Sequence, residues 1–143
     1  MYKNENLEHK LIEHEGIRKS AYQDSMGYWT IGAGRLIDAR KNAGLSIDEI
    51  FYLLRNDIDR TYQALVNYSW FKSLCDVRQG VLIELAFNVG VNGLLGFKRM
   101  IAALEPLNPA LAAKEMLDSA WAKQVGEARS KDMAQRMQLG RYI

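Results

Sequence analysis

Two carboxylic acids and a hydroxyl lie close together near the start of this chain of 143 residues. Eight residues separate Glu15 from Asp24, and five more separate Asp24 from Thr30. Hydrolysis of a glycosidic bond uses such a set: an acid that protonates the leaving oxygen, a carboxylate on the opposite face of the sugar, and a polar group that holds water. Each residue alone would be ordinary, because Glu15 could simply end a helix and Asp24 could simply form a turn. Together they are candidate catalytic residues.

The residues around this set predict the elements that would position it. An apolar stripe at helical intervals is followed by a glycine, so we predict a helix over about 6–15. Residues 18–37 are typical of short strands and turns, because they combine aromatic and β-branched residues with a turn signal. We therefore expect Glu15 at the end of a helix, Asp24 on a turn and Thr30 on the strand that follows.

From Ser46 onward the sequence is typical of helices. Ser46 and Glu49 form a capping box, after which apolar residues recur at helical intervals as far as Leu65. Further helices are predicted over about 76–89, 97–104, 109–121 and 130–139, with Gly90 and Gly93 breaking the first of them. The fold class is α+β and predominantly α. We predict one domain over 1–143, with a small β-hairpin lobe over about 16–45 and a helical main lobe over about 46–143 plus the N-terminal helix.

The composition is that of an ordinary globular protein, with 48% hydrophobic and 25% charged residues and a net charge of +2. The single cysteine, Cys75, excludes an intrachain disulfide. His9 and His14 have no further ligands near them, so no metal site is expected.

The sequence has no basic run with interleaved aromatic residues, the pattern that would indicate nucleic-acid binding. No apolar run approaches the length of a membrane span. Charged residues crowd the first 15 positions, which argues against a secretory signal peptide.

The stretch from His14 to Gly34 resembles the catalytic region of the phage-type lysozymes, the endolysin muramidases. In these proteins a Glu, an Asp and a Thr occur at the same intervals, within a frame rich in glycine and aromatic residues. The resemblance continues over 46–62, 86–90, 119–121 and 129–140, so in effect it covers the whole chain. It implies a lysozyme-like fold with a cleft between the two lobes. It also implies hydrolysis, with an inverting course, of the β-1,4 bond between N-acetylmuramic acid and N-acetylglucosamine in peptidoglycan. No cofactor or metal is implied, because two carboxyl groups and a water suffice.

The resemblance implies roles for individual residues. Glu15 would protonate the glycosidic oxygen, Asp24 would act from the other side of the sugar, and Thr30 would help to hold the water. Arg129 matches an arginine that pairs with the catalytic glutamate, and Asn88 matches a cleft-lining amide that could bind an N-acetyl group. The residues themselves leave two alternatives open: Arg129 as a surface charge, and Asn88 as the cap of a helix end.

Three residues near Thr30 complete the candidate substrate-binding set. Tyr28 and Trp29 alternate on a predicted strand, so one of them is a candidate to stack on a sugar ring. Gly32 belongs to a glycine pair that would permit a tight turn or the close approach of a bulky ligand such as a sugar.

One departure from the family lies at Arg35, where many members have histidine. The position that matches its ion-pair partner is Asp57. We therefore expect a structural Arg35–Asp57 pair, which would be insensitive to pH near neutrality because arginine stays charged.

Two other functions remain open. A lytic transglycosylase acts on the same bond but lets a hydroxyl of the sugar attack in place of water; the presence of Asp24 and Thr30 favours hydrolysis. The second alternative is a catalytically silent wall-binding module, although none of the three reactive positions has been replaced.

The lack of a signal peptide suggests a phage endolysin, expected to be a monomer. It would collect in the host cytoplasm until a holin gives it access to the wall, and delivery in a phage tail is the alternative.

Overall fold

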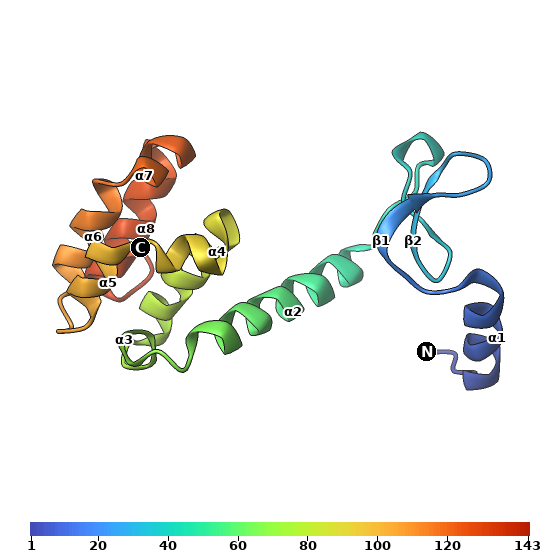
Figure 1. Ribbon diagram of the computed structural model, residues 1–143, viewed down its shortest axis with the longest axis horizontal. Helices are drawn as coiled ribbons and strands as arrows, with labels where there is room; N and C mark the ends of the chain where they lie inside the picture. Colours follow the sequence, from blue (N-terminus) through green and yellow to red (C-terminus); the bar gives the residue numbers. More distant parts are fainter. The chain divides into compact units, whose positions relative to one another are not determined.

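Helices dominate the computed structural model, which describes residues 1–143, and a small antiparallel sheet forms near the N-terminus (Figure 1). This result confirms the predicted α+β, predominantly α, fold class. The chain divides into two compact units, residues 1–53 and residues 54–143. The boundary falls inside the long helix α2, Ile47–Leu65. The extents of the domain and its lobes, as drawn from the sequence, stay a prediction.

The first helix, α1, runs from Glu5 to Glu15, within one residue of the predicted bounds. Asn4 caps its start, because the Asn4 side chain accepts a hydrogen bond from the backbone N–H of Leu7 at 3.0 Å. Gly16 ends it with φ of +77°, and its N–H donates to the carbonyl of Ile12 at 2.8 Å. Glu15 is therefore fixed as the last helical residue, directly before a backbone conformation that favours glycine.

Three short strands follow α1 and form one antiparallel sheet in the order β1-β2-β3. Their bounds are Arg18–Gln23 for β1, Trp29–Gly32 for β2 and Arg35–Leu36 for β3. An irregularity in β1 shifts its register against β2, a local distortion that bends a strand. A 3-10 turn, Ala39–Lys41, lies beyond β3. The predicted strands and turns over 18–37 are thus confirmed.

The capping box predicted at the start of α2 is present. The Ser46 Oγ accepts a hydrogen bond from the backbone N–H of Glu49 at 3.2 Å, and the Glu49 Oε1 accepts one from the N–H of Ser46 at 2.8 Å. The helix ends at the predicted Leu65.

Six helices make up the rest of the second unit. They are α3, Ser69–Lys72; α4, Asp76–Leu95; α5, Lys98–Leu104; α6, Pro109–Leu117; α7, Ala120–Val125; and α8, Glu127–Leu139. Gly90 is non-helical, with φ of +77° and ψ of 164°, so α4 is kinked there and resumes beyond it. The sequence predicted this break but not the helical segment that follows.

Two other boundaries differ from the prediction. The helix expected over 109–121 is two helices, because Ser119 starts a new one: its Oγ accepts from the N–H of Ala122 at 3.4 Å and donates to the carbonyl of Met116 at 2.6 Å. The last helix begins at Glu127, three residues earlier than expected, after Gly126 with φ of +89°. Both differences arise from local capping that apolar periodicity does not report.

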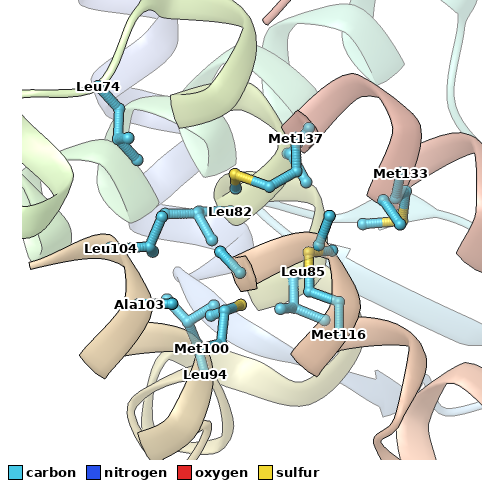
Figure 2. Close-up of a cluster of buried hydrophobic side chains, with 14 of the residues drawn as sticks. Leu74, Leu82, Leu85, Leu94, Met100, Ala103, Leu104, Met116, Met133 and Met137 are labelled. Carbon is cyan, nitrogen blue, oxygen red and sulfur yellow. The ribbon is translucent and has the colours of Figure 1, made fainter. Parts of the chain in front are cut away.

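The hydrophobic core belongs to the second unit, and methionine and leucine side chains fill its centre (Figure 2). Met100, Met116, Met133 and Met137 are each at most 1% exposed. Flexible thioether side chains fill irregular gaps between helices, and truncating one to alanine would cost about 2–5 kcal/mol. In the first unit, by contrast, the buried residues are polar: Thr30 and Asp38. Hydrogen bonds therefore organise the small sheet.

No single helix is both long enough and apolar enough to span a membrane. The helices α4 and α5, which meet at 93°, have the necessary length and composition only when taken together.

Candidate active site

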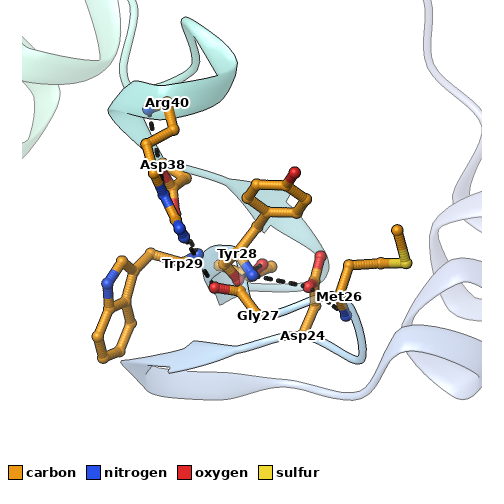
Figure 3. Close-up of polar contacts among 8 residues, drawn as sticks. Asp24, Met26, Gly27, Tyr28, Trp29, Asp38 and Arg40 are labelled. Carbon is orange, nitrogen blue, oxygen red and sulfur yellow. Dashed lines mark hydrogen bonds and ion pairs between the residues drawn. The ribbon is translucent and has the colours of Figure 1, made fainter.

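Asp24 occupies the turn between β1 and β2, and its carboxylate organises that turn (Figure 3). Its Oδ1 accepts hydrogen bonds from the backbone N–H groups of Met26 and Tyr28, both at 2.9 Å. The Asp24 N–H donates to the carbonyl of Tyr28, and the N–H of Gly27 donates to the carbonyl of Asp24, also at 2.9 Å. Because both side-chain bonds go to Oδ1, the Oδ2 atom keeps its lone pairs for another donor.

Thr30 lies on β2 and is only 5% exposed. It is paired with Tyr22 of β1 on one side and with Leu36 of β3 on the other. Its Oγ1 donates a hydrogen bond to the carbonyl of Tyr28 at 3.1 Å. Since the hydroxyl proton is used in this bond, any further partner of Oγ1 must donate to its lone pairs.

The buried carboxylate of Asp38 ties the hairpin to the segment after β3, a role that the sequence did not predict. Its Oδ2 accepts from the N–H of Trp29 at 3.0 Å, while the guanidinium of Arg40 donates to Oδ1 at 3.0 Å and to Oδ2 at 2.7 Å (Figure 3). The bonds from Arg40, and then the one from Trp29, hold the pKa of Asp38 well below its usual range. The same guanidinium donates to the carbonyl of Gly27 at 2.9 Å. One arginine thus links Asp38 to the turn that carries Asp24.

The two aromatic candidates have different surroundings. The Arg40 guanidinium carbon lies 5.1 Å from the centroid of the Tyr28 ring, and the Lys41 Nζ lies 4.6 Å from it, so cations cover this ring. Trp29 is 46% exposed, and its backbone is held by Asp38. Trp29 is therefore the more accessible ring for stacking.

Glu15 is exposed at the end of α1, and its carboxyl group lies against the turn between β2 and β3. A Cβ atom placed on Gly34 would be 3.0 Å from both the Cδ and the Oε2 atoms of Glu15. Gly32, the last residue of β2, has no heavy atom within 4 Å of the place its Cβ would take. The backbone is therefore covered by Glu15 at Gly34 and open at Gly32.

Arg35 pairs with Glu49 within the first unit, and the expected pair with Asp57, which belongs to the second unit, stays a prediction. The Nη1 of Arg35 lies 2.5 Å from the Oε2 of Glu49 and donates to the carbonyl of Gly44 at 3.4 Å, while Asp57 lies 4.0 Å from Arg60. The hydrogen bond from Arg35, followed by that from the Ser46 N–H, lowers the pKa of Glu49 to about 2. Glu49 already has its other oxygen fixed by the capping box, which pre-orders it for this partner.

Asn88 is exposed on α4, and its Oδ1 accepts a 2.9 Å hydrogen bond from the indole Nε1 of the buried Trp121 on α7. The side chain thus binds a tryptophan, not the helix end beside Gly90. Trp121 also lines a cavity of about 600 Å³ with charged groups at its border, among them Arg99 and Glu115.

Arg129, on α8, lies 3.5 Å by its Nε from the Oε1 of Glu84 and is 44% exposed in its side chain. The other oxygen of Glu84 accepts a 2.8 Å hydrogen bond from Arg136, which also donates to Asp132 at 2.8 Å. Arg136 is only 8% exposed, so it forms the centre of this network and Arg129 lies at its edge.

The structure brings the predicted residues together in two groups within the first unit. Asp24, Tyr28, Trp29 and Thr30 share the β1–β2 hairpin, and Glu15 meets the turn that follows β2. In the second unit Asn88 and Arg129 bind Trp121 and Glu84. No group of three or more His, Cys, Asp or Glu side chains that could hold a metal ion occurs in the structure.

Comparison with known proteins points to one family. The sequence profile described as phage lysozyme matches residues 12–138. A relative from Dictyostelium discoideum, described as probable T4-type lysozyme 1, is 27% identical over 134 residues, which cover 75% of this chain and 79% of the relative. The chain therefore belongs to the phage lysozyme family and is an enzyme of the lysozyme type, a peptidoglycan hydrolase.

Proposed function

We propose that this lysozyme hydrolyses the β-1,4 bond between N-acetylmuramic acid and N-acetylglucosamine, with Glu15, Asp24 and Thr30 as its catalytic residues. The observation that carries the proposal is the state of two groups on one hairpin. The Oδ2 of Asp24 has free lone pairs, and the proton of the Thr30 hydroxyl is already donated to the carbonyl of Tyr28. Both groups can therefore only accept from a water, which has two protons to donate.

The reaction follows from these roles. Glu15 gives its proton to the glycosidic oxygen as the bond from that oxygen to C1 of N-acetylmuramic acid breaks. A water held by Thr30 and Asp24 forms the new bond to C1 from the opposite face, and its proton passes to the Asp24 carboxylate. The products are a new reducing end on one fragment and a free 4-hydroxyl on the other. Exchange of protons with solvent restores Glu15 and Asp24.

Other residues are proposed to bind the polymer. Trp29 offers an exposed ring for a sugar face. Because the Asn88 oxygen is occupied by Trp121, the free part of its amide is the NH₂ group, a donor suited to a carbonyl oxygen such as that of an N-acetyl group. The open backbone at Gly32, the last residue of β2, suits close approach of a sugar. Arg129 is proposed as a supporting residue for the general acid from its place in the family sequence.

The catalytic proposal is tested with Glu15→Gln and, as a matched control on the same helix, Glu13→Gln. Glu13 is exposed and pairs with Lys10 at 3.0 Å. With purified peptidoglycan and a reducing-end assay, Glu15→Gln should lose activity by about 10³-fold or more, because the amide cannot donate the proton in an acid-catalysed step. Glu13→Gln should keep wild-type activity. Full activity in a folded Glu15→Gln variant would reject the assignment.

We further propose that the protein is a monomeric phage endolysin that stays in the host cytoplasm until a holin opens the membrane. The match of residues 12–138 to the phage lysozyme family supports this role. Expression inside a susceptible bacterium should leave cells intact, and co-expression of a holin should lyse them. Lysis without the holin would contradict the role while leaving the enzymatic proposal in place.

A further inference from the structure

The contact between Glu15 and Gly34 joins two segments that are far apart in sequence. Gly34 lies in the turn between β2 and β3, and the position of a Cβ on it would be 3.0 Å from the Cδ, 3.0 Å from the Oε2 and 3.1 Å from the Cγ of Glu15. These distances are shorter than ordinary van der Waals contact between carbon atoms, which begins near about 3.5 Å. The carboxyl group therefore occupies space that is available only because residue 34 has no side chain.

Gly32, at the end of β2, and Gly34, in the turn that follows, have similar φ angles but different surroundings. Gly32 has φ of +70° and Gly34 has φ of +78°. Both angles lie in the left-handed region, which glycine adopts more readily than other residues. Gly32 has no heavy atom within 4 Å of its Cβ position, whereas Gly34 has three atoms of Glu15. The positive φ alone thus explains the glycine at 32. At 34 a glycine is needed also because a Cβ atom would collide with the Glu15 side chain.

Little else restrains the Glu15 side chain within the first unit. It is exposed at the last position of α1, and no side chain or backbone N–H of that unit donates a hydrogen bond to its carboxyl group. A glutamate with three rotatable bonds would otherwise sample several rotamers. The backbone surface at Gly34 is the contact that limits where the carboxyl group can lie.

We propose that Gly34 is a positioning residue for Glu15: the bare backbone at this turn is the surface against which the general acid rests. The proposal rests on the catalytic role of Glu15 proposed above. A side chain at 34 would displace the Glu15 carboxyl group, because the end of a flexible side chain moves more easily than the turn. Misplacement by 1 Å can cost about 100-fold in rate, so a shift of a few tenths of an ångström is expected to cost about 10-fold.

The first test compares Gly34→Ala with Gly44→Ala. Gly44 also has positive φ, +151°, but no heavy atom within 4 Å of its Cβ position, so it controls for backbone strain in the same unit. On soluble peptidoglycan fragments, Gly34→Ala should lower kcat by about 10-fold with KM within about twofold, since only the acid is displaced. Gly44→Ala should retain kcat.

A second readout does not depend on activity. With ¹³C-labelled glutamate carboxyl groups, the NMR resonance of Glu15 Cδ, assigned by its loss in Glu15→Gln, should shift in Gly34→Ala and stay unchanged in Gly44→Ala. If Gly34→Ala does not fold, Gly34→Asn adds the same Cβ with a residue that tolerates positive φ better.

The outcomes separate this proposal from the proposed function. A folded variant at 34 with the wild-type Glu15 resonance and kcat within twofold would overturn the positioning role. A shifted Glu15 resonance in the variant would support the contact between Glu15 and Gly34. If the wild type at the same time releases no peptidoglycan fragments, the contact stands but the proposed catalytic function of Glu15 is rejected.

Discussion

The Oδ1 of Asn88 accepts a hydrogen bond from the buried Nε1 of Trp121, and this 2.9 Å contact joins α4 to α7. An indole N–H can only donate, so the bond determines which half of the Asn88 amide faces outward. The same contact that orders the second unit thereby leaves a donor exposed on its surface.

Asn88→Ala should therefore destabilise the protein. The Trp121 N–H would be left buried without a partner, at a cost of about 1–2 kcal/mol in the free energy of unfolding. Asn92→Ala, also exposed on α4, is the matched control and should be close to neutral. Denaturant unfolding followed by tryptophan fluorescence measures both. Equal stability of the two variants would contradict the role assigned to this bond.

Asp38→Asn should loosen the small sheet. The amide can no longer accept from Arg40 through both oxygens, and its NH₂ group would face a guanidinium, which is also a donor. A fall in Tm of about 5 °C is expected, and the backbone amide resonances of Trp29 and Gly27 should move. Asp59→Asn, an exposed position on α2, controls for the loss of one negative charge. Unmoved resonances in Asp38→Asn would exclude the linkage.

The Arg35–Glu49 pair should give the protein an acid-dependent stability. Because the folded-state pKa of Glu49 is lowered from 4.5 to about 2, its contribution is fully present above pH 4.5 and is lost as the pH falls toward 2. Glu49→Gln keeps an oxygen for the Ser46 N–H but removes the charge. The Tm of wild type should exceed that of Glu49→Gln at pH 6. This excess should shrink toward zero as the pH falls from 4.5 to 2. A difference that is constant over this range would contradict the pair.

The two arginines that bind Glu84 should differ in their effect on stability. Arg136→Ala removes a buried stem and three charge-assisted hydrogen bonds to Glu84 and Asp132. The expected loss is about 2 kcal/mol, reduced from that of a fully buried pair because its partners are partly exposed. Arg129→Ala should lose about 0.5 kcal/mol or less, as an exposed pair at 3.5 Å does. Equal losses in denaturant unfolding would show that Arg136 does not hold this network together.

Features determined by neighbouring residues could be predicted from the sequence. The glycine that ends α1, the Asp24 turn and the Ser46–Glu49 capping box all form between residues at most four apart, and the structure has each of them. The prediction of helix boundaries was wrong where a single capping residue, Ser119, starts a new helix inside a continuous apolar pattern.

Contacts between distant segments could not be predicted in this way. The resemblance gave Asp57 as a partner of Arg35, and it did not report Glu49, whose carboxylate the capping box holds near the start of α2 and which pairs with Arg35 in the structure. The contact of Glu15 with Gly34 spans 19 positions, and that of Asn88 with Trp121 spans 33. Such contacts depend on how the elements pack, which residue types alone do not report.

The most direct test of the central claim is mass spectrometry of peptidoglycan fragments released in H₂¹⁸O by wild type and by Glu15→Gln. Water-mediated cleavage by Glu15 predicts wild-type fragments with one ¹⁸O at the reducing end of N-acetylmuramic acid, and almost no fragments from the variant. Fragments that end in anhydro-sugars without ¹⁸O would contradict hydrolysis and identify a transglycosylase. Labelled fragments from Glu15→Gln at the wild-type rate would contradict the role of Glu15.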